Sequence, residues 1–213
     1  MTLESSKTLG GIGAVLMLIG IFPYINYFGI IEIIGAILIL FALRDIGNIY
    51  RERGIFSNAI YGVAVAVVGS VITAILALAV VLSNLKDLLM QIYPGWNGDW
   101  ATLQGMTPNT SNIDPSAIFP LIGGLLVVLV IVWVFAIIAA FFIWRSLKQV
   151  ANKTNVGLFG TAGLLLLVGA IIPIFGLLLI WIAALLLAIA FFTMKTTGQP
   201  IATATSPPPP TTV

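Results

Sequence analysis

The stretch "AIYGVAVAVVGSVITAILALAVVL", residues 59–82, contains no charged side chain and is long enough to cross a lipid bilayer. A membrane-spanning α-helix needs about 20 predominantly apolar residues. The whole chain shares this character, since 60% of its residues are hydrophobic and 8% are charged. A soluble domain has about 25% charged residues. Such a chain cannot cover a water-facing surface, and the sequence therefore predicts an integral membrane protein.

Five further apolar runs accompany this one, which predicts an all-α protein with six transmembrane helices. Short turns, "PYINY" and "PIFG", join the first two and the last two runs, so each pair is predicted to form a tight hairpin. The two hairpins would flank a central pair that is longer than a bilayer requires and is expected to tilt or project beyond it. The predicted spans are Leu9–Ile25, Phe28–Leu43, Ala59–Leu82, Ile118–Trp144, Leu158–Phe175 and Leu177–Met194.

Basic residues next to the spans predict the orientation, because cytoplasmic segments of membrane proteins are enriched in Lys and Arg. With the N-terminus inside, Lys86 is the one basic residue in an outer segment. The inner segments hold the others: Lys7, Arg44, Arg51, Arg53, Arg145, Lys148, Lys153 and Lys195. The sequence therefore predicts a multi-pass protein of the cell membrane with both termini in the cytoplasm. A cleavable signal peptide is disfavoured, since the first run leads into "FPYINY" and not into a small-residue cleavage site.

The predicted membrane domain comprises residues 1–195 and has one sizeable outer loop, residues 83–117. The first part of this loop, "SNLKDLLMQIY", has leucines at helical spacing and is expected to continue the third span or to lie along the interface. Trp96 and Trp100 suit the outer aromatic belt of a membrane protein. Residues 196–213 are predicted to form a disordered, Thr/Pro-rich cytoplasmic tail.

The two predicted hairpins resemble each other. "LGGIGAVLMLIGIFPYINYFGIIEIIGA", from Leu9, and "LFGTAGLLLLVGAIIPIFGLLLIWIAA", from Leu158, share Gly, Pro and Phe-Gly landmarks in one order. Apolar segments of low complexity align readily by chance, but the ordered landmarks favour an internal duplication. Both copies would start from the cytoplasmic side, unlike the inverted three-plus-three repeats of many transporters.

Three other segments are more specific. They are the opening "LESSKTLGGIGAVLMLIG", the "RERGIFSNAIYG" at the start of the third span and the closing "AIAFFTMK". Together they resemble an archaeal family of integral membrane proteins, domain-of-unknown-function family 996, over most of residues 3–195 outside the outer loop. The resemblance implies a multi-span archaeal membrane protein and assigns no activity and no functional residue.

The chain contains no Cys and no His. This excludes disulfides, metal sites built on thiolate or imidazole, and catalytic arrangements that use Cys or His. An intramembrane enzyme would need paired acids or a nucleophile with a base, whereas the spans offer one carboxylate and isolated hydroxyls. We therefore expect no catalytic residue, no cofactor and no metal site. The net charge of +2 gives no indication of a nucleic-acid partner.

The one carboxylate within the predicted spans is Glu32. An ionisable group inside an apolar span is by default a functional hypothesis. Glu32 follows Phe28 by one helical turn, about 6 Å below the predicted outer end, where Tyr24, Asn26 and Tyr27 offer hydrogen bonds. One interpretation is a proton- or cation-binding carboxylate that faces the bundle. We favour the other, a hydrogen-bonded or partly protonated Glu at the interface, because no second acid or basic partner accompanies it.

The third span carries a ladder of small residues at a spacing of four: Gly62, Ala66, Ser70 and Ala74. Small residues at this spacing let helix backbones approach closely in lipid, so the ladder predicts helix packing. Lining of a pore by Ser70 and Thr73 is the alternative, although each hydroxyl can also bond a carbonyl of its own helix.

The inner loop "LRDIGNIYRERG", residues 43–54, is basic and begins at the membrane. Arg44, Arg51 and Arg53 are candidates for contacts with anionic lipid headgroups or a cytoplasmic partner; ordinary positive-inside anchoring is the simpler interpretation, which we prefer. The outer "NTS" at Asn109 is a possible glycosylation acceptor, a weak motif on its own.

For function, these features favour a non-enzymatic accessory or scaffold subunit, or a homo-oligomer, that acts through helix packing. Its partners would be the lipid bilayer and other membrane-protein subunits or copies of itself. The alternative is a small transporter or channel for ions or an apolar solute, with Glu32 as its candidate site.

Overall fold

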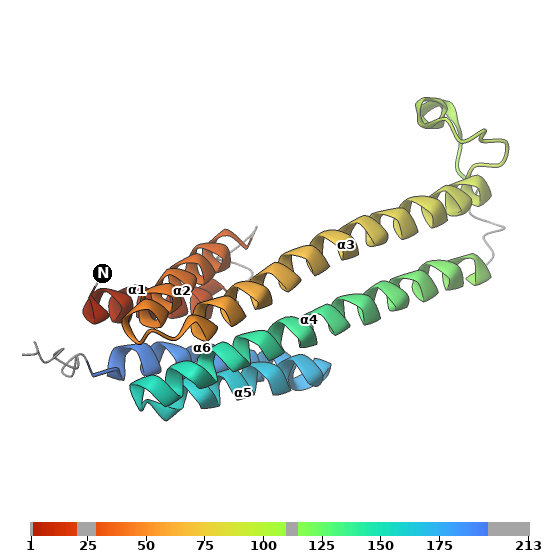
Figure 1. Cartoon of the computed structure of the whole chain (residues 1–213). Coiled ribbons are helices and arrows are strands. Elements are labelled where there is room, and N and C mark those ends of the chain that lie inside the picture. The colour runs from red at the N-terminus through yellow and green to blue at the C-terminus, as the bar shows by residue number, and fades with distance from the viewer. Residues whose placement is uncertain (1, 21–28, 110–114, 196–213) are drawn as a thin grey trace, which may run out of the picture.

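In the computed structural model, which describes residues 2–20, 29–109 and 115–195, every regular element of these ranges is a helix (Figure 1). The all-α prediction is confirmed for these residues, whereas the predicted tail at 196–213 lies outside them. The α-helices are α1 (Leu3–Gly20), α2 (Ile30–Ile49), α3 (Arg53–Ile92), α4 (Phe119–Thr154), α5 (Gly157–Ile171) and α6 (Pro173–Thr193), and two 3-10 helices, η1 (Trp100–Gly105) and η2 (Pro115–Ile118), lie between α3 and α4.

Three of the described helices are long and apolar enough to cross a membrane: α3, α4 and the segment Phe175–Thr193 of α6. Helix α5 is apolar but has only 15 residues. Helices α1 and α2 have 18 and 20 residues and include charged side chains. By length and composition, α3 and α4 are therefore the clearest spans.

Helices α3 and α4 are much longer than the others, with 40 and 36 residues. At 1.5 Å per residue they measure about 60 and 54 Å, against about 30 Å for the hydrocarbon core of a bilayer. Proline occurs in these helices only at Pro120, in the first turn of α4, where no backbone donor is required. Helix α3 runs on to Ile92. The segment "SNLKDLLMQIY" thus continues the third predicted span, the first of the two arrangements expected for it.

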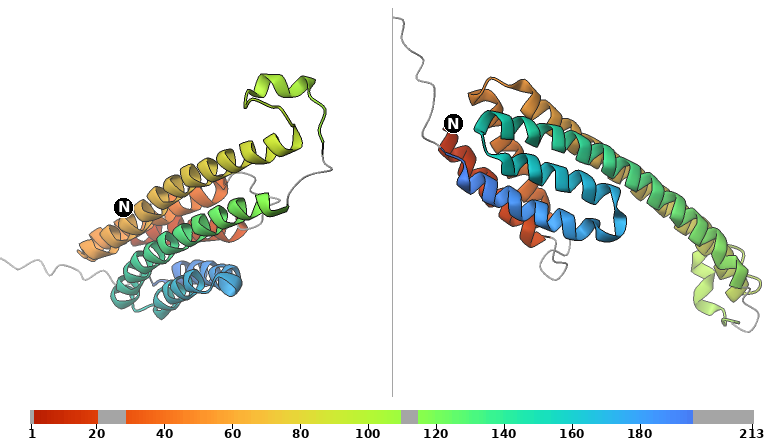
Figure 2. Two further views of the ribbon diagram at one scale, coloured as in Figure 1. Left: turned by 90° about the vertical axis from the view of Figure 1, so that its right-hand side faces the viewer. Right: turned by 90° about the horizontal axis from the view of Figure 1, so that it is seen from below.

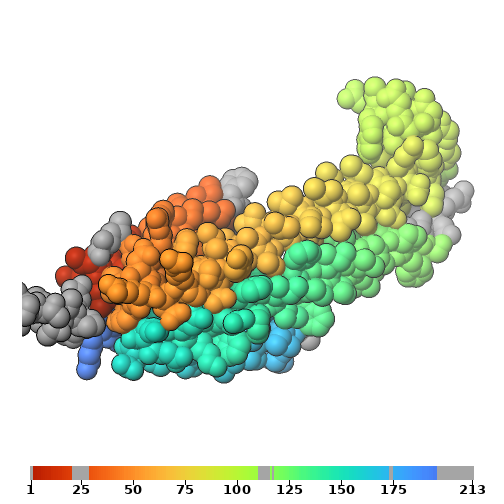
Figure 3. All heavy atoms as spheres, in the orientation of Figure 1, coloured from red at the N-terminus to blue at the C-terminus, as the bar shows by residue number. Residues whose placement is uncertain are grey.

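The shorter helices gather around one end of the long pair. Helix α1 packs along α2, α5 along α6 and α3 along α4, while further contacts join α1 to α6, α4 to α5 and α2 to α3. Figures 1 and 2 show α1, α2, α5 and α6 beside the first half of α3 and the second half of α4. The remaining halves run on together, and in Figure 3 they form a ridge that extends well beyond the shorter helices. We call this ridge, residues 73–92 of α3 with 119–132 of α4, the two-helix arm.

The buried core lies at the opposite end, where α3 begins and α4 ends. Each α-helix contributes to it, and the aromatic rings of Phe159 and Phe191 meet edge to face with centroids 4.9 Å apart. One buried side chain from each helix, in chain order, is Leu3, Ile46, Ile55, Leu147, Phe159 and Phe191. Most basic side chains of the described chain lie at this end, which we call the basic end.

A hydrogen bond marks the height at which the shorter helices stop. The indole nitrogen of Trp133, on α4, donates to the carbonyl oxygen of Ala170 in the last turn of α5, at 2.8 Å. The last carbonyls of a helix have no partner within that helix, and hydrocarbon offers them none. Trp133 follows Phe119 by 14 residues, so α4 continues for about 21 Å beyond this contact.

Close backbone approaches hold the α1–α2 pair together. A Cβ atom added at Gly13 would lie 2.6 Å from the carbonyl oxygen of Gly35, and one added at Gly35 would lie 2.6 Å from that of Gly13. Only glycine leaves room for two backbones at this distance. Glycines also bring α5 and α6 together, since Gly169 lies against Gly176. In lipid, such contacts supply the dispersion energy that holds helices together.

We predict that Gly13→Ala destabilises the protein by about 1–3 kcal/mol, because the methyl group would force α1 and α2 apart. Gly123→Ala is the matched control, since nothing lies within 4 Å of its added Cβ. Alanine is favoured over glycine inside a helix by about 0.5–1 kcal/mol, so this variant should be neutral or more stable. Thermal unfolding of purified protein in mild detergent measures both effects. Equal unfolding temperatures for the two variants would contradict the close contact.

Candidate functional site

Glu32 lies in the first turn of α2, three residues after Gly29, a glycine whose φ of 68° lies in the left-handed region. Its side chain is half-buried. Within the described ranges, no hydrogen bond or ion pair of Glu32 is formed. The residues expected to solvate it, Tyr24, Asn26 and Tyr27, fall outside those ranges. Glu32 is therefore a carboxylate without a second acid or a base beside it in the part of the chain that is described.

The depth of Glu32 can be compared with that of α4. Arg44 shares a pocket with Ile60 of α3, and Gly62 of α3 meets Ile143 of α4, so Arg44 and Arg145 lie at similar heights. Glu32 precedes Arg44 by 12 residues, about 18 Å along α2. The apolar stretch of α4 runs about 39 Å from Arg145 to Phe119. Along the molecule, Glu32 is thus closer to the middle of this stretch than to its outer end.

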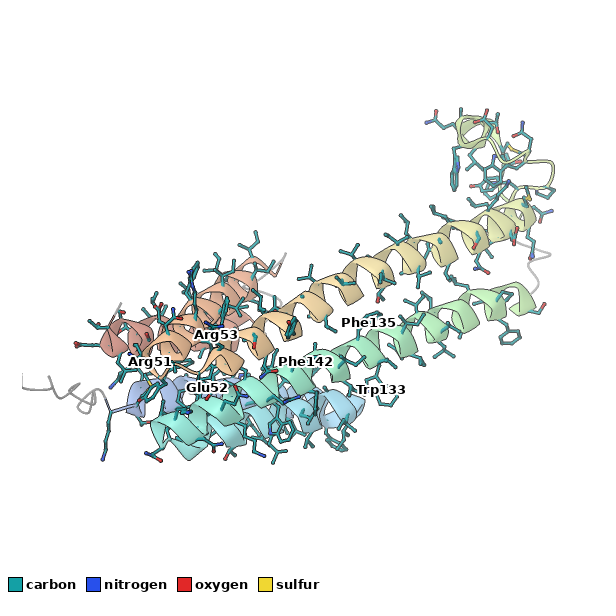
Figure 4. All side chains as sticks on the ribbon, viewed as in Figure 1. Arg51, Glu52, Arg53, Trp133, Phe135 and Phe142 are labelled. Atoms are coloured by element: carbon teal, nitrogen blue, oxygen red, sulfur yellow. The ribbon has the colours of Figure 1, made fainter. Side chains whose placement is uncertain are left out.

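The small residues of α3 divide between two surfaces. Gly62 is buried against Ala139 and Ile143 of α4, and Gly69 of the neighbouring row is buried against Phe135. Figure 4 shows Phe135 and Phe142 of α4 beside α3. The other members of the predicted ladder, Ala66, Ser70 and Ala74, are exposed. The ladder therefore packs inside the chain at one position and leaves three small residues on an open edge.

The hydroxyls of α3 bond to their own helix. Ser70 Oγ donates to the carbonyl of Val67 at 2.8 Å, and Thr73 Oγ1 donates to that of Gly69 at 2.6 Å. A polar side chain between helices in lipid can serve as an interhelical donor, but here both protons are used locally. Neither hydroxyl needs a pore to satisfy it.

The predicted basic candidates lie around the connection between α2 and α3. Arg44, Arg51 and Arg53 are exposed, and Arg51 has a φ of 53° at the turn. Figure 4 shows Arg51, Glu52 and Arg53 close together at the start of α3. Arg44 also lines an apolar pocket of about 190 Å³ between α2 and α3, together with Ile37, Leu40, Phe41, Phe56 and Ile60.

Glu52 forms a contact that sequence reasoning missed. Its carboxylate lies 3.1 Å from Lys153 Nζ, which ties the α2–α3 connection to the last turn of α4. The two side chains are 35% and 43% exposed, so the pair contributes at most about 1 kcal/mol. Ser146 makes a second link between α3 and α4, since its buried hydroxyl donates to the carbonyl of Ile55 at 2.7 Å. In each contact the two partners are distant in sequence, so no local sequence pattern predicts either contact.

Residues 93–109, after α3, fold into a small cap on the arm. Trp96 is buried, and its indole donates to the carbonyl of Asp99 at 2.6 Å, with the Trp100 ring edge-on at 5.3 Å. The expectation of an aromatic belt is therefore wrong for Trp96, which packs within the cap, while Trp100 is exposed. Asn109 is exposed, whereas the rest of its acceptor motif lies outside the described residues.

A second pocket lies on α4 at the basic end. Its volume is about 320 Å³, and its lining is Phe141, Trp144, Arg145, Lys148, Gln149 and Asn152. The guanidinium carbon of Arg145 lies 6.0 Å from the centre of the Phe141 ring, and Lys148 Nζ lies 5.1 Å from that of Trp144. Sequence reasoning treated both cations only as orientation signals. The i, i+4 spacing of each aromatic–cation pair was the available clue.

Comparison with known proteins shows that the sequence of this chain matches one protein family. The sequence profile of the family described as "Protein of unknown function (DUF996)" matches residues 31–191. An uncharacterized protein of Methanocaldococcus jannaschii, MJ1644, is 29% identical over 196 residues, which cover 91% of this chain and 94% of the relative. No solved structure matches the chain.

Proposed function

The chain belongs to the DUF996 family of proteins of unknown function, as the sequence resemblance indicated, and we propose that it is a non-enzymatic multi-pass membrane protein that acts through helix contacts. Its role is that of a homo-oligomer, or of an accessory or scaffold subunit for another membrane protein. The observation that carries the proposal is the open edge of Ala66, Ser70 and Ala74 on α3.

The open edge has the properties of a helix-packing surface. Its three small residues follow one another at a spacing of four, beside the row that packs on α4. Large apolar side chains flank it, among them Val67 and Val71, both more than half exposed. A second helix laid on this edge could approach the α3 backbone more closely than large side chains would allow, although not as closely as α4 does at Gly62. Close approach is what makes small residues useful in lipid, where the hydrophobic effect does not drive helices together.

The membrane topology is part of the same proposal. Six spans with both termini in the cytoplasm place the basic end inside and the cap of the two-helix arm outside. The charge distribution supports this orientation, since Arg44, Arg51, Arg53, Arg145 and Lys148 lie at the basic end and Lys86 lies near the cap. In this arrangement each shorter helix has one end at the inner face and the other end below the tip of the arm.

Cysteine labelling tests the topology, because the native chain has no Cys. We expect an impermeant maleimide to label Gln104→Cys in intact cells and Asn48→Cys only after permeabilisation, since both positions are exposed on opposite ends of the molecule. Ser146→Cys serves as a burial control and should remain unlabelled in both cases, because Ser146 is fully buried. Labelling of Asn48→Cys from outside would reverse the proposed orientation.

Self-association is tested by adding bulk to the open edge. We predict that Ala66→Leu combined with Ala74→Leu weakens assembly by about tenfold or more, because overpacking a helix contact costs about 1–3 kcal/mol. Light scattering in mild detergent, with cross-linking and mass spectrometry of co-purifying proteins, reports the assembly.

The matched control for this experiment is Ala79→Leu. Ala79 is exposed and follows Ser70 by nine residues, two and a half helical turns, so it lies on the opposite face of α3. Ala79→Leu should assemble like the wild type. A wild-type particle that is strictly monomeric and retains no other protein would overturn the proposal.

A transporter or channel is the second candidate function, and the depth of Glu32 is the observation that favours it. A charged side chain at the centre of a membrane span costs roughly 2.5–3.5 kcal/mol on insertion scales, and ionisable groups placed there often serve in ion or proton pathways. No second acid or base accompanies Glu32 in the described residues, so we rank this function below assembly.

Reconstituted vesicles separate the two functions. We expect Glu32→Gln and Glu32→Leu to leave expression and assembly nearly unchanged, and we expect no difference in proton or cation flux down an imposed gradient. If the wild type carries a flux that Glu32→Gln abolishes, transport through Glu32 replaces assembly as the function.

A further inference from the structure

We propose that the pocket on α4 lined by Phe141, Trp144, Arg145, Lys148, Gln149 and Asn152 binds the phosphate of an anionic phospholipid from the inner leaflet. The inference rests on the proposed membrane orientation and does not depend on the oligomeric state. The residues that line this pocket differ from Arg44, Arg51 and Arg53, the headgroup contacts that the sequence predicted.

The two cations of the pocket are available for an anion. Neither Arg145 nor Lys148 forms an ion pair with a carboxylate in the described ranges, and both side chains are exposed. Lys153, one to two turns further along α4, is paired with Glu52. No acidic residue lines the pocket. The C-terminal part of α4 thus holds one lysine paired with a carboxylate and, beside it, two cations on one helix face without such a partner in the described residues.

The aromatic rings hold both cations toward the membrane. Side chains on an α-helix lean toward its N-terminus, and the N-terminus of α4 lies at the outer end in the proposed orientation. Arg145 accordingly leans over Phe141, and Lys148 leans over Trp144. An isolated basic side chain at a helix end would extend its charge into water. Here the ring contacts direct both charges, in the proposed orientation, toward the membrane rather than toward the cytoplasm.

The remaining surface suits the rest of a phospholipid. Arg and Lys are the usual ligands of phosphate, and the exposed amide of Asn152 adds a neutral donor on the aqueous side. Three exposed apolar side chains precede Arg145 on the same face of α4, at spacings of three or four residues: Val134, Ile138 and Phe141. An acyl chain can lie along this track while its headgroup occupies the pocket. A soluble phosphate ester would gain nothing from the track, which is why a lipid is the proposed occupant.

Native mass spectrometry of the full-length protein in mild detergent tests the proposal, with phosphatidylglycerol as the anionic probe and phosphatidylcholine as the neutral one. We expect the wild type to retain phosphatidylglycerol in preference. Arg145→Gln combined with Lys148→Gln should weaken this retention roughly 25-fold, about fivefold for each cation removed. The charge-preserving Lys148→Arg should bind as the wild type does.

The matched control is Arg51→Gln combined with Arg53→Gln, which removes the same charge from exposed positions outside the pocket. If the pocket is the binding site, this variant should retain phosphatidylglycerol nearly as the wild type does, because neither arginine lines the pocket. Equal losses in both double variants, or no loss in the pocket variant, would overturn the site in favour of non-specific attraction. The single variants Arg145→Gln and Lys148→Gln decide the question if the double variant does not fold. The same spectra count the chains per particle, so a failure of assembly is read separately from a failure of lipid binding.

Discussion

The contact between α3 and α4 is the interaction on which the rest of the molecule depends. Gly62 and Gly69 remove side-chain volume from α3 at two levels, and Ile143 and Phe135 of α4 occupy the space. These glycines let two helices of about 60 and 54 Å pack along their length. Helix α2 packs on α3, and helix α5 packs on α4. Helices α1 and α6 pack on α2 and α5, and a contact between α1 and α6 joins the two shorter pairs.

The difference in helix length has a physical consequence at the outer ends of the shorter helices. Hydrocarbon cannot accept or donate hydrogen bonds, so helix ends at membrane depth require partners from the protein. The indole of Trp133 supplies one to the carbonyl of Ala170. The need for a donor at the C-terminal end of α5 thereby explains why Trp133 occurs in the middle of the otherwise apolar α4. The two-helix arm continues past this level without the shorter α-helices beside it, and many of its large apolar side chains are exposed.

The basic end combines the buried core with the charges that face the cytoplasm in the proposed orientation. Its charged groups differ in their partners: Lys153 is paired with Glu52, whereas Arg145 and Lys148 lie against aromatic rings of their own helix. The paired lysine fastens the α2–α3 connection to α4. The other two cations have no carboxylate partner in the described residues and belong to the proposed phospholipid site. Neighbouring basic residues of similar orientation can therefore have separate roles, one internal and the other directed at the membrane.

The sequence by itself determined the helical class, the apolar segments and the small residues of α3. Continuous apolar runs in lipid must satisfy their backbone internally, and a helix does this within one segment. Tertiary structure decided which small residues are used inside the chain. Gly62 and Ala66 look alike in a spacing pattern, but α4 covers only the first, because contact depends on the face that the neighbour occupies. The Glu52–Lys153 pair, the Trp133–Ala170 bond and the height of Glu32 were likewise decided only in three dimensions, since each depends on how helices distant in sequence are placed side by side.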